Sequence, residues 1–234
     1  EKSFGKEHDY VSVLTDIDQS RVLEVVQDRT IAACNQLWKT LTKQQLQRIQ
    51  SVSMDMWQAF MTSAAGHVPW AKIVHDRFHI AKYLGEAVDK VRRAEHRELK
   101  KEGESPLTGL RQLFLYNQEH LDEDSYYEVL TIRRADLKTG RAWAIKENFR
   151  HFWTYRTRRW GQRFFARWYG WAIRSQLQPI KNVAKMLRRH LDGLLNYFDH
   201  RVTNATSEGF NSRIQSINSA ARGFRNFDNY RTRI

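Results

Sequence analysis

The chain has 234 residues, of which 41% are hydrophobic and 28% charged, so it can bury a core and is not intrinsically disordered. Its formal net charge of +13 favours a polyanionic partner, either nucleic acid or an acidic membrane surface, over a basic surface with no partner. No apolar run approaches the roughly 20 residues of a membrane-spanning helix, and the single cysteine, Cys34, excludes an internal disulfide and favours a reducing compartment.

The beginning of the chain predicts a β-hairpin followed by a helix. Residues 10–14 and 21–26 are short segments rich in β-branched residues, and the acidic turn at residues 16–20 separates them. The next segment is predicted to be helical from about Ile31 to Ile49, where apolar residues recur among Gln, Lys and Arg.

Two short predicted strands then end on acidic residues. Residues 52–55 predict a buried strand that ends at Asp55, and residues 72–76 predict a second strand that ends at Asp76. A helix that includes residues 58–61 is predicted between them. Strands that alternate with helices and end on acids indicate an α/β sheet with a functional site at its edge.

From about Phe78 to Phe198 the sequence predicts helices and no strand. The first of these helices carries an amphipathic stripe at positions i, i+3, i+4 and i+7, formed by Leu84, Ala87, Val88 and Val91. Residues 103–106 are predicted to break this helix. Further breaks or kinks are predicted at Gly140, Gly161, Gly170 and Pro179.

The C-terminal segment predicts a capped amphipathic helix. Residues 203–207 can cap a helix that starts near Glu208. At about 100° per residue, one face of this helix is apolar and contains Phe210, Ile214, Ile217 and Ala221. The opposite face contains Glu208, Asn211, Ser212 and Gln215. Because the apolar face can lie on a sheet, Glu208 is expected to point into polar space, which suits a metal-binding carboxylate.

The acidic residues Asp55, Asp76 and Glu208 are candidates for a metal site that acts on DNA. Phosphodiester chemistry needs carboxylates that hold two divalent cations about 4 Å apart beside a polyanion. Mg²⁺ prefers a few carboxylates and keeps several waters, and a basic protein with carboxylates at strand ends meets both requirements. Taken singly, an acid at a strand end is more commonly a turn former or a helix cap.

His75 and His79 stand four residues apart, a spacing that also occurs in zinc-binding helices. Asp76 occupies the position where that motif has Glu, and His75 lies in a predicted strand rather than in a helix. With one cysteine in the chain, no Cys cluster supplies further ligands. A zinc protease site is therefore not predicted.

Four segments occur in order along the chain, namely Ser53–Trp57, His75–His79, Thr203–Gln215 and Ala221–Asn226. Together they resemble the ISL-three family of bacterial insertion-sequence transposases, and the segment before Tyr10 resembles the first strand and hairpin of that family. The resemblance covers essentially the whole chain. It implies a DDE-class transposase with an α/β, RNase H-like catalytic core, in which a mixed sheet is flanked by helices. Residues 1–80 and 201–234 would form this core, and residues 81–200 a large all-helical insertion.

The resemblance also implies roles for the candidate acids. By motif, Asp55 corresponds to the second acid of the catalytic triad and Glu208 to the third, and both would bind Mg²⁺ or Mn²⁺. Asp76 and His79 lie in a motif of the family, and they either take part in catalysis or hold neighbouring residues in position. The first catalytic Asp of the family directly precedes the segment that starts here at Glu1. The first catalytic strand is therefore expected to be truncated, in a chain that is the middle of a larger protein.

DNA is the partner that the resemblance implies, at both the transposon ends and the target, with a homodimer or higher oligomer because two ends are joined. Arginines alternate with aromatic residues between residues 150 and 174. Arginine can hold phosphate, and aromatic rings can stack on unpaired bases. Most of these rings are predicted to form the core of the insertion, while one or two exposed Trp stack on DNA. The predicted DNA-binding residues are Arg156, Arg158, Arg159, Arg163, Arg167, Arg213 and Arg222.

The expected location is the bacterial cytoplasm, with action at the nucleoid. Two other functions remain open at this point. A catalytically incomplete DNA-binding or assembly module, derived from a transposase, is consistent with the expected absence of the first Asp. A basic protein of the membrane surface is disfavoured, because the chain has an evident α/β core.

Overall fold

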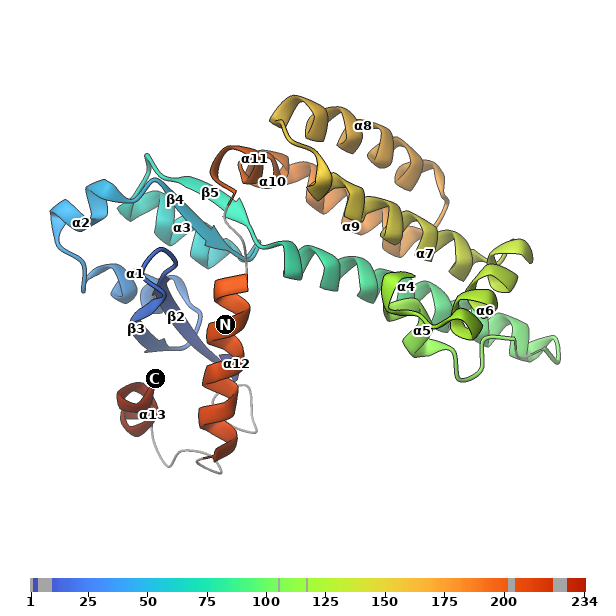
Figure 1. Cartoon of the computed structure of the whole chain (residues 1–234), viewed down its shortest axis with the longest axis horizontal. Helices are drawn as coiled ribbons and strands as arrows, with labels where there is room; N and C mark the ends of the chain where they lie inside the picture. Colours follow the sequence, from blue (N-terminus) through green and yellow to red (C-terminus); the bar gives the residue numbers. More distant parts are fainter. Residues whose placement is uncertain (1, 4–9, 105, 117, 202–204, 221–226) are drawn as a thin grey trace. The chain divides into compact units, whose positions relative to one another are not determined.

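The computed structural model describes residues 2–3, 10–104, 106–116, 118–201, 205–220 and 227–234 (Figure 1). The chain divides into two compact units. The α/β unit comprises residues 1–76 and 200–234, and the helical unit comprises residues 77–199. The predicted α/β class is confirmed as a mostly helical chain with two small sheets.

The predicted hairpin is confirmed in the α/β unit. Strands β2 (Tyr10–Asp16) and β3 (Arg21–Gln27) pair antiparallel, and β1 (Lys2–Ser3) adds to the other edge of β2. In the turn, the Asp16 carboxylate accepts a hydrogen bond from the Gln19 N–H at 3.0 Å. Ser20 adopts a left-handed φ of 50°, which lets the chain reverse before β3.

The predicted helix from Ile31 to Ile49 is two helices instead, α1 (Ile31–Trp38) and α2 (Lys43–Arg48). The division follows from a capping box, in which the Thr42 side chain accepts from the Gln45 N–H and the Gln45 side chain accepts from the Thr42 N–H. Reciprocal bonds of this kind satisfy two donors at a helix start, so a new helix begins where the sequence pattern predicted continuation.

The two predicted short strands are confirmed, and they form a parallel pair. Strand β4 (Ser51–Met54) leads through α3 (Gln58–His67) into β5 (Lys72–His75), and the two strands pair in parallel. The helix is needed because two parallel strands must be joined by a crossover. Trp38 of α1 packs with Ala64 and Val68 at the end of this crossover, and the Trp38 indole N–H donates to the Ser63 hydroxyl at 2.9 Å.

The last helices, α12 (Ala205–Ala220) and α13 (Phe227–Arg233), belong to the α/β unit. Ile214 and Tyr230 form one buried cluster with Val11 of β2 and Val25 of β3. The prediction that the acidic helix packs on a sheet is thus confirmed at Ile214. The helix begins at Ala205, three residues earlier than the expected start at Glu208. Residues 203, 204 and 221, which the sequence placed in its cap and apolar face, lie outside the described residues.

The helical unit contains α-helices throughout and, among its described residues, no strand. Its long first helix, α4 (Arg77–Lys101), buries the predicted stripe of Leu84, Ala87, Val88 and Val91. It contacts α7 (Lys138–Phe149) and α9 (Gln178–Arg189), while α8 (Arg158–Arg174) packs on both α7 and α9. The remaining elements are α5 (Arg111–Leu115), α6 (Glu123–Arg134), α10 (Leu191–Leu195), α11 (Tyr197–His200) and two 3₁₀ segments, Gln118–His120 and Arg150–Thr154.

Two helix ends in this unit are completed by side chains of other helices. The N-terminus of α7 lacks a cap of its own, and the buried Glu95 carboxylate of α4 accepts from the Lys138 N–H at 2.6 Å and the Thr139 N–H at 2.7 Å. At the C-terminus of α5, the buried Lys146 ammonium donates to the carbonyls of Phe114, Leu115 and Tyr116 at 3.1, 3.1 and 2.7 Å. Burial lowers the pKa of Lys146. Both contacts place charge where helix ends favour it.

The breaks predicted at Gly140, Gly161 and Gly170 are wrong, because these glycines lie within α7 and α8. The predicted break at Pro179 is confirmed, because α8 ends at Arg174 and α9 begins at Gln178, which puts Pro179 in the first turn of the new helix, where proline is tolerated. Gly161 is required by close packing instead. A Cβ at this position would overlap the ring of Phe198, and one at Gly140 would lie 2.9 Å from the Arg133 Cα.

We expect Gly161→Ala and Gly170→Ala to have opposite effects on stability, although both lie in α8. At Gly170 the nearest atom to a new Cβ is the flexible Arg174 guanidinium, at 3.2 Å, so the helix propensity of alanine should add up to about 1 kcal/mol. At Gly161 overpacking against Phe198 should outweigh that gain and destabilise by roughly 1–2 kcal/mol. Thermal denaturation measures both, and equal melting temperatures would contradict this account.

None of the described helices is long and apolar enough to cross a membrane.

Candidate active site

Asp55 and Asp76 lie side by side at the carboxyl edge of the β4–β5 pair. The strands pair from Ser51 opposite Lys72 to Met54 opposite His75. The Asp76 N–H extends this ladder by donating to the Met54 carbonyl at 3.0 Å. Neighbouring strands are about 4.8 Å apart, so the two half-buried acids occupy adjacent positions at one edge. The two predicted strands therefore place Asp55 and Asp76 at neighbouring strand ends.

Trp57, two residues after Asp55, contacts Arg29, which follows the second strand of the hairpin. The Asp55 carboxylate accepts from the Met56 N–H at 2.6 Å, and the Trp57 indole N–H donates to the Arg29 carbonyl at 3.1 Å. The Arg29 guanidinium lies over two rings, 3.9 Å from the Tyr10 centroid and 4.4 Å from the Trp57 centroid. Cation–π contacts of this kind stabilise the cation and fix its position. Arg29 was missed in the sequence, because its partners are distant in the chain.

The two histidines of the second motif lie in different elements. His75 is buried in β5, whereas His79 is in the first turn of α4, where its ring packs edge-on against Phe78 at 5.9 Å. His75 thus lies in a strand, as predicted, and the two histidines do not form an i, i+4 pair on one helix. Within the described parts of the chain, no group of three or more His, Cys, Asp or Glu residues is placed to hold a metal.

Glu208, the expected third acid, lies in the first turns of α12, and its side chain is outside the described residues. It belongs to the same unit as Asp55 and Asp76. By residue type these three acids fit Mg²⁺ or Mn²⁺, since carboxylate oxygens are the ligands that these hard cations prefer. The described side chains supply the adjacent pair Asp55 and Asp76, and α12 carries Glu208.

The predicted DNA-binding arginines have different environments. Arg158 is engaged within the helical unit, where its guanidinium donates to Asn196 at 2.8 Å, Asp192 at 3.1 Å and Asp199 at 3.2 Å. These bonds tie the start of α8 to α10 and α11. Arg156, Arg159, Arg163, Arg167 and, in α12, Arg213 are exposed, and Arg222 lies outside the described residues.

The aromatic residues divide as predicted. Phe149, Phe152, Phe164, Phe165 and Trp168 are buried in the core of the helical unit, and Phe149 packs against Phe152 and Trp168 with centroid distances of 5.4 and 4.6 Å. Two tryptophans of α8 remain exposed, Trp160 at 50% and Trp171 at 41%. The Arg163 guanidinium lies 5.2 Å from the Trp160 ring centroid.

A second group of cations was missed in the sequence. Lys185, Arg188 and Arg189 of α9 line a pocket with Tyr169 of α8. These cations could have been predicted from the composition of α9, which contains two lysines, two arginines and no acidic residue.

Comparisons with known proteins agree with the resemblance found in the motifs. The ISL-three family of DDE transposases, whose description is "Transposase", matches residues 1–234. The chain is 27% identical over 228 residues to the transposase for insertion sequence element IS1001 of Bordetella parapertussis, with 96% of this chain and 56% of the relative covered. It is 23% identical over 248 residues to the transposase for insertion sequence element IS1557 of Mycobacterium tuberculosis, with the same coverage. The chain thus spans about half the length of these relatives, and no solved structure matches it significantly.

Proposed function

Because the chain belongs to the ISL-three family of transposases, we propose that it is the catalytic part of an enzyme that cuts DNA at insertion-sequence ends and joins the 3′ ends to target DNA. The observation that carries this proposal is the position of Asp55 beside Asp76 at the carboxyl edge of β4 and β5. Acids at that edge, in a chain of net charge +13, suit chemistry on a polyanion.

We propose that the α/β unit is an RNase H-like core. An antiparallel sheet of β1, β2 and β3, a parallel pair of β4 and β5, and a covering helix α12 support this assignment. Residues 81–200 would then be a helical insertion between two parts of the core, consistent with the contiguous helical unit.

Asp55 and Glu208 would hold Mg²⁺ or Mn²⁺ in this core. When bound, such ions lower the pKa of a coordinated water or hydroxyl and stabilise the charge on the leaving oxygen. The protein would supply the positions of the carboxylates, through the β4–β5 register and the packing of Ile214 of α12 on Val11 and Val25. Asp76, next to Asp55, would act as a further ligand or orient Asp55, and its chain neighbour Arg77 and nearby His79 belong to the same motif.

DNA at the transposon ends and at the target would be the substrate, and a homodimer or higher oligomer would hold two ends together. The exposed arginines 156, 159, 163, 167 and 213 would contact phosphates, and Trp160 and Trp171 would stack on unpaired bases. Arg158, whose side chain is 37% exposed, would contact phosphate in addition to its bonds within the helical unit.

The test is a cleavage assay with the full-length protein and labelled duplexes that carry the ends of its element. We expect nicking and joining of 3′ ends in Mg²⁺ or Mn²⁺, and neither product in EDTA. DNA binding without cleavage in either metal would instead favour the catalytically incomplete DNA-binding or assembly module.

A further inference from the structure

Helices α8 and α9 of the helical unit carry positive charge only. The sequence of α8 contains five arginines, that of α9 contains two lysines and two arginines, and neither contains an acidic residue. Ile180, Ala184 and Leu187 of α9 are fully buried. Because an amphipathic helix directs its polar residues away from its buried face, the cations of α9 lie on its exposed side.

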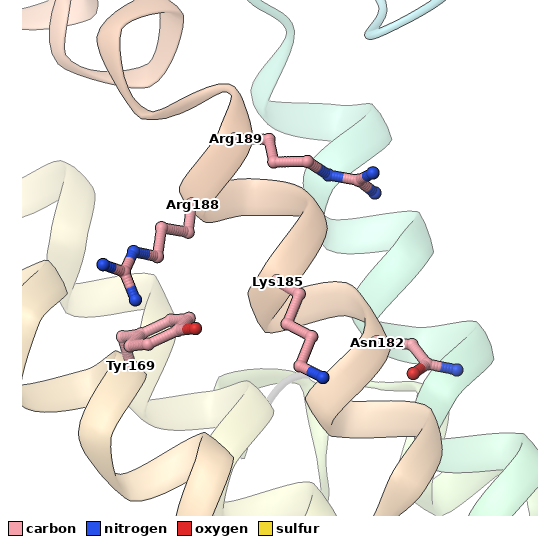
Figure 2. Close-up of a pocket in the computed structure, with 5 residues that line it drawn as sticks. All are labelled: Tyr169, Asn182, Lys185, Arg188 and Arg189. Atoms are coloured by element: carbon pink, nitrogen blue, oxygen red, sulfur yellow. The ribbon is translucent and has the colours of Figure 1, made fainter.

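The cations border a pocket on this surface. Tyr169 of α8 and Asn182, Lys185, Arg188 and Arg189 of α9 line a volume of about 620 Å³ (Figure 2). Figure 2 shows Arg188 extending over the Tyr169 ring and Arg189 extending to the other side of α9, with Lys185 one turn earlier. The Arg188 guanidinium lies 4.9 Å from the ring centroid. A cation–π contact uses the positive charge of a guanidinium and not its N–H groups, which can still donate to another partner.

The charges of this pocket are not neutralised within the described structure. The carboxylates of the helical unit form their ion pairs elsewhere, for example Asp89 with Arg92 and Arg93. In the described part of the chain, no ion pair involves Lys185, Arg188 or Arg189. The neighbouring His190 responds to this excess of charge, since burial and then the positive charge of Arg189 lower its pKa.

The amide of Asn182 in the pocket is also available as a hydrogen-bond donor. The Asn182 carbonyl oxygen accepts a hydrogen bond from the Gln178 side-chain amide at 2.7 Å. With its oxygen engaged, Asn182 presents its NH₂ group. The pocket therefore offers an amide, an ammonium, two guanidinium groups and a phenol hydroxyl, all of which donate hydrogen bonds. A set of donors with no carboxylate suits an anion with several acceptor oxygens, as a phosphate has.

The spacing of the cations fits a repeating anion better than a single one. Lys185 and Arg189 are separated by four residues, which is about 6 Å along the helix axis. Phosphates of one DNA strand repeat about every 3.4 Å along the duplex axis. The row from Asn182 to Arg189 is thus long enough to contact more than one backbone phosphate.

We propose that the Tyr169–Arg189 pocket binds backbone phosphates of DNA and anchors the DNA on the helical unit independently of its sequence. The choice of DNA over other polyanions rests on the proposed function. Contacts to phosphate position a protein on DNA but read no sequence, so random-sequence DNA should use this pocket as well as transposon ends do.

Salt-dependent binding of a random-sequence duplex to the full-length protein tests this proposal. We would measure fluorescence anisotropy in EDTA, where cleavage cannot interfere. The plot of log K against log [salt] has a negative slope. Lys185→Gln and Arg189→Gln should each make this slope less steep, by about 0.9. Near 0.1 M salt, each should weaken binding by about tenfold, which follows from the same relation. Arg188→Lys keeps the charge but loses the stacked guanidinium, so it should weaken binding with little change in slope.

Lys100→Gln is the matched control. Lys100 lies in the last turn of α4 and does not line the pocket. Its substitution removes the same charge as Lys185→Gln, so it should leave the slope unchanged. All variants should melt at the wild-type temperature, because the altered side chains are exposed. If Lys185→Gln and Arg189→Gln bind DNA as the wild type does, the pocket is not a DNA site, and an acidic protein becomes the partner to test.

This experiment separates the two proposals. If the pocket variants lose DNA affinity but the wild-type protein does not cleave DNA, the catalytic proposal is overturned and the proposal for the pocket stands. Unchanged DNA affinity in a protein that cleaves normally would overturn the pocket alone.

Discussion

Asp55→Ala in the full-length protein is expected to lower the rate of DNA strand cleavage by about 10³-fold or more. Bound cations contribute several kcal/mol to the stabilisation of transition-state charge, and each 1.36 kcal/mol corresponds to about a tenfold change in rate. Glu208→Ala should cause a loss of the same order if it holds the same ions. DNA binding in EDTA should be unchanged or slightly tighter, because a negative charge is removed beside a polyanion.

The control for this experiment is Asp18→Ala, which removes an exposed acid from the turn between β2 and β3. It should cleave at the wild-type rate. Asp76→Asn distinguishes the two roles left open for Asp76. A loss of about 10–100-fold is typical of a residue that orients a metal ligand, whereas a loss equal to that of Asp55→Ala would make Asp76 a ligand. Full cleavage by Asp55→Ala would show that this edge of the sheet is not the active site.

Glu95→Ala is expected to destabilise the helical unit by about 3 kcal/mol. The Glu95 side chain is buried and accepts three hydrogen bonds, two from the backbone of α7 and one from the Thr139 hydroxyl at 2.6 Å. Removing the carboxylate leaves buried donors unsatisfied, at about 1–3 kcal/mol for such groups. Urea denaturation followed by circular dichroism measures the loss, and Glu95→Gln should lie between the wild type and alanine.

Glu98→Ala provides a close control on the same helix. Glu98 bonds to the Lys138 ammonium at 2.6 Å, but both side chains are exposed to solvent. This bond lowers the pKa of Glu98 and raises that of Lys138, yet exposed pairs contribute little to stability. Glu98→Ala should therefore unfold at nearly the wild-type urea concentration. If the two variants are equally stable, the capping of α7 by Glu95 does not stabilise the unit.

The local parts of the fold could be predicted from the sequence. Strands β2, β3, β4 and β5 are short, β-branched segments bounded by turns, and these signals depend only on neighbouring residues. The buried stripe of α4 follows from helical periodicity in the same way. Asp55 and Asp76 were found for this reason, since each directly follows a recognisable strand.

What could not be predicted depends on contacts between distant residues. Gly161 was expected to break a helix, because glycine does so in isolation, but its position is determined by Phe198 in another helix. The bonds of Arg158 could not be predicted either, since only the fold brings Asp192, Asn196 and Asp199 to its guanidinium. The α9 pocket was missed because its charges are interpretable only once Ile180 and Leu187 fix the buried face.

The discontinuity of the α/β unit has a consequence for the order in which the protein folds during synthesis. Val11 and Val25 of the hairpin are covered by Ile214 and Tyr230, and Arg231 bonds to Glu24 across 207 residues. Ribosomes add about 5–20 residues per second, so the contiguous helical unit is complete a few seconds before α13 has been made. The α/β unit can close only after the whole helical unit has been synthesised. Until then, the nascent hairpin keeps an uncovered apolar face.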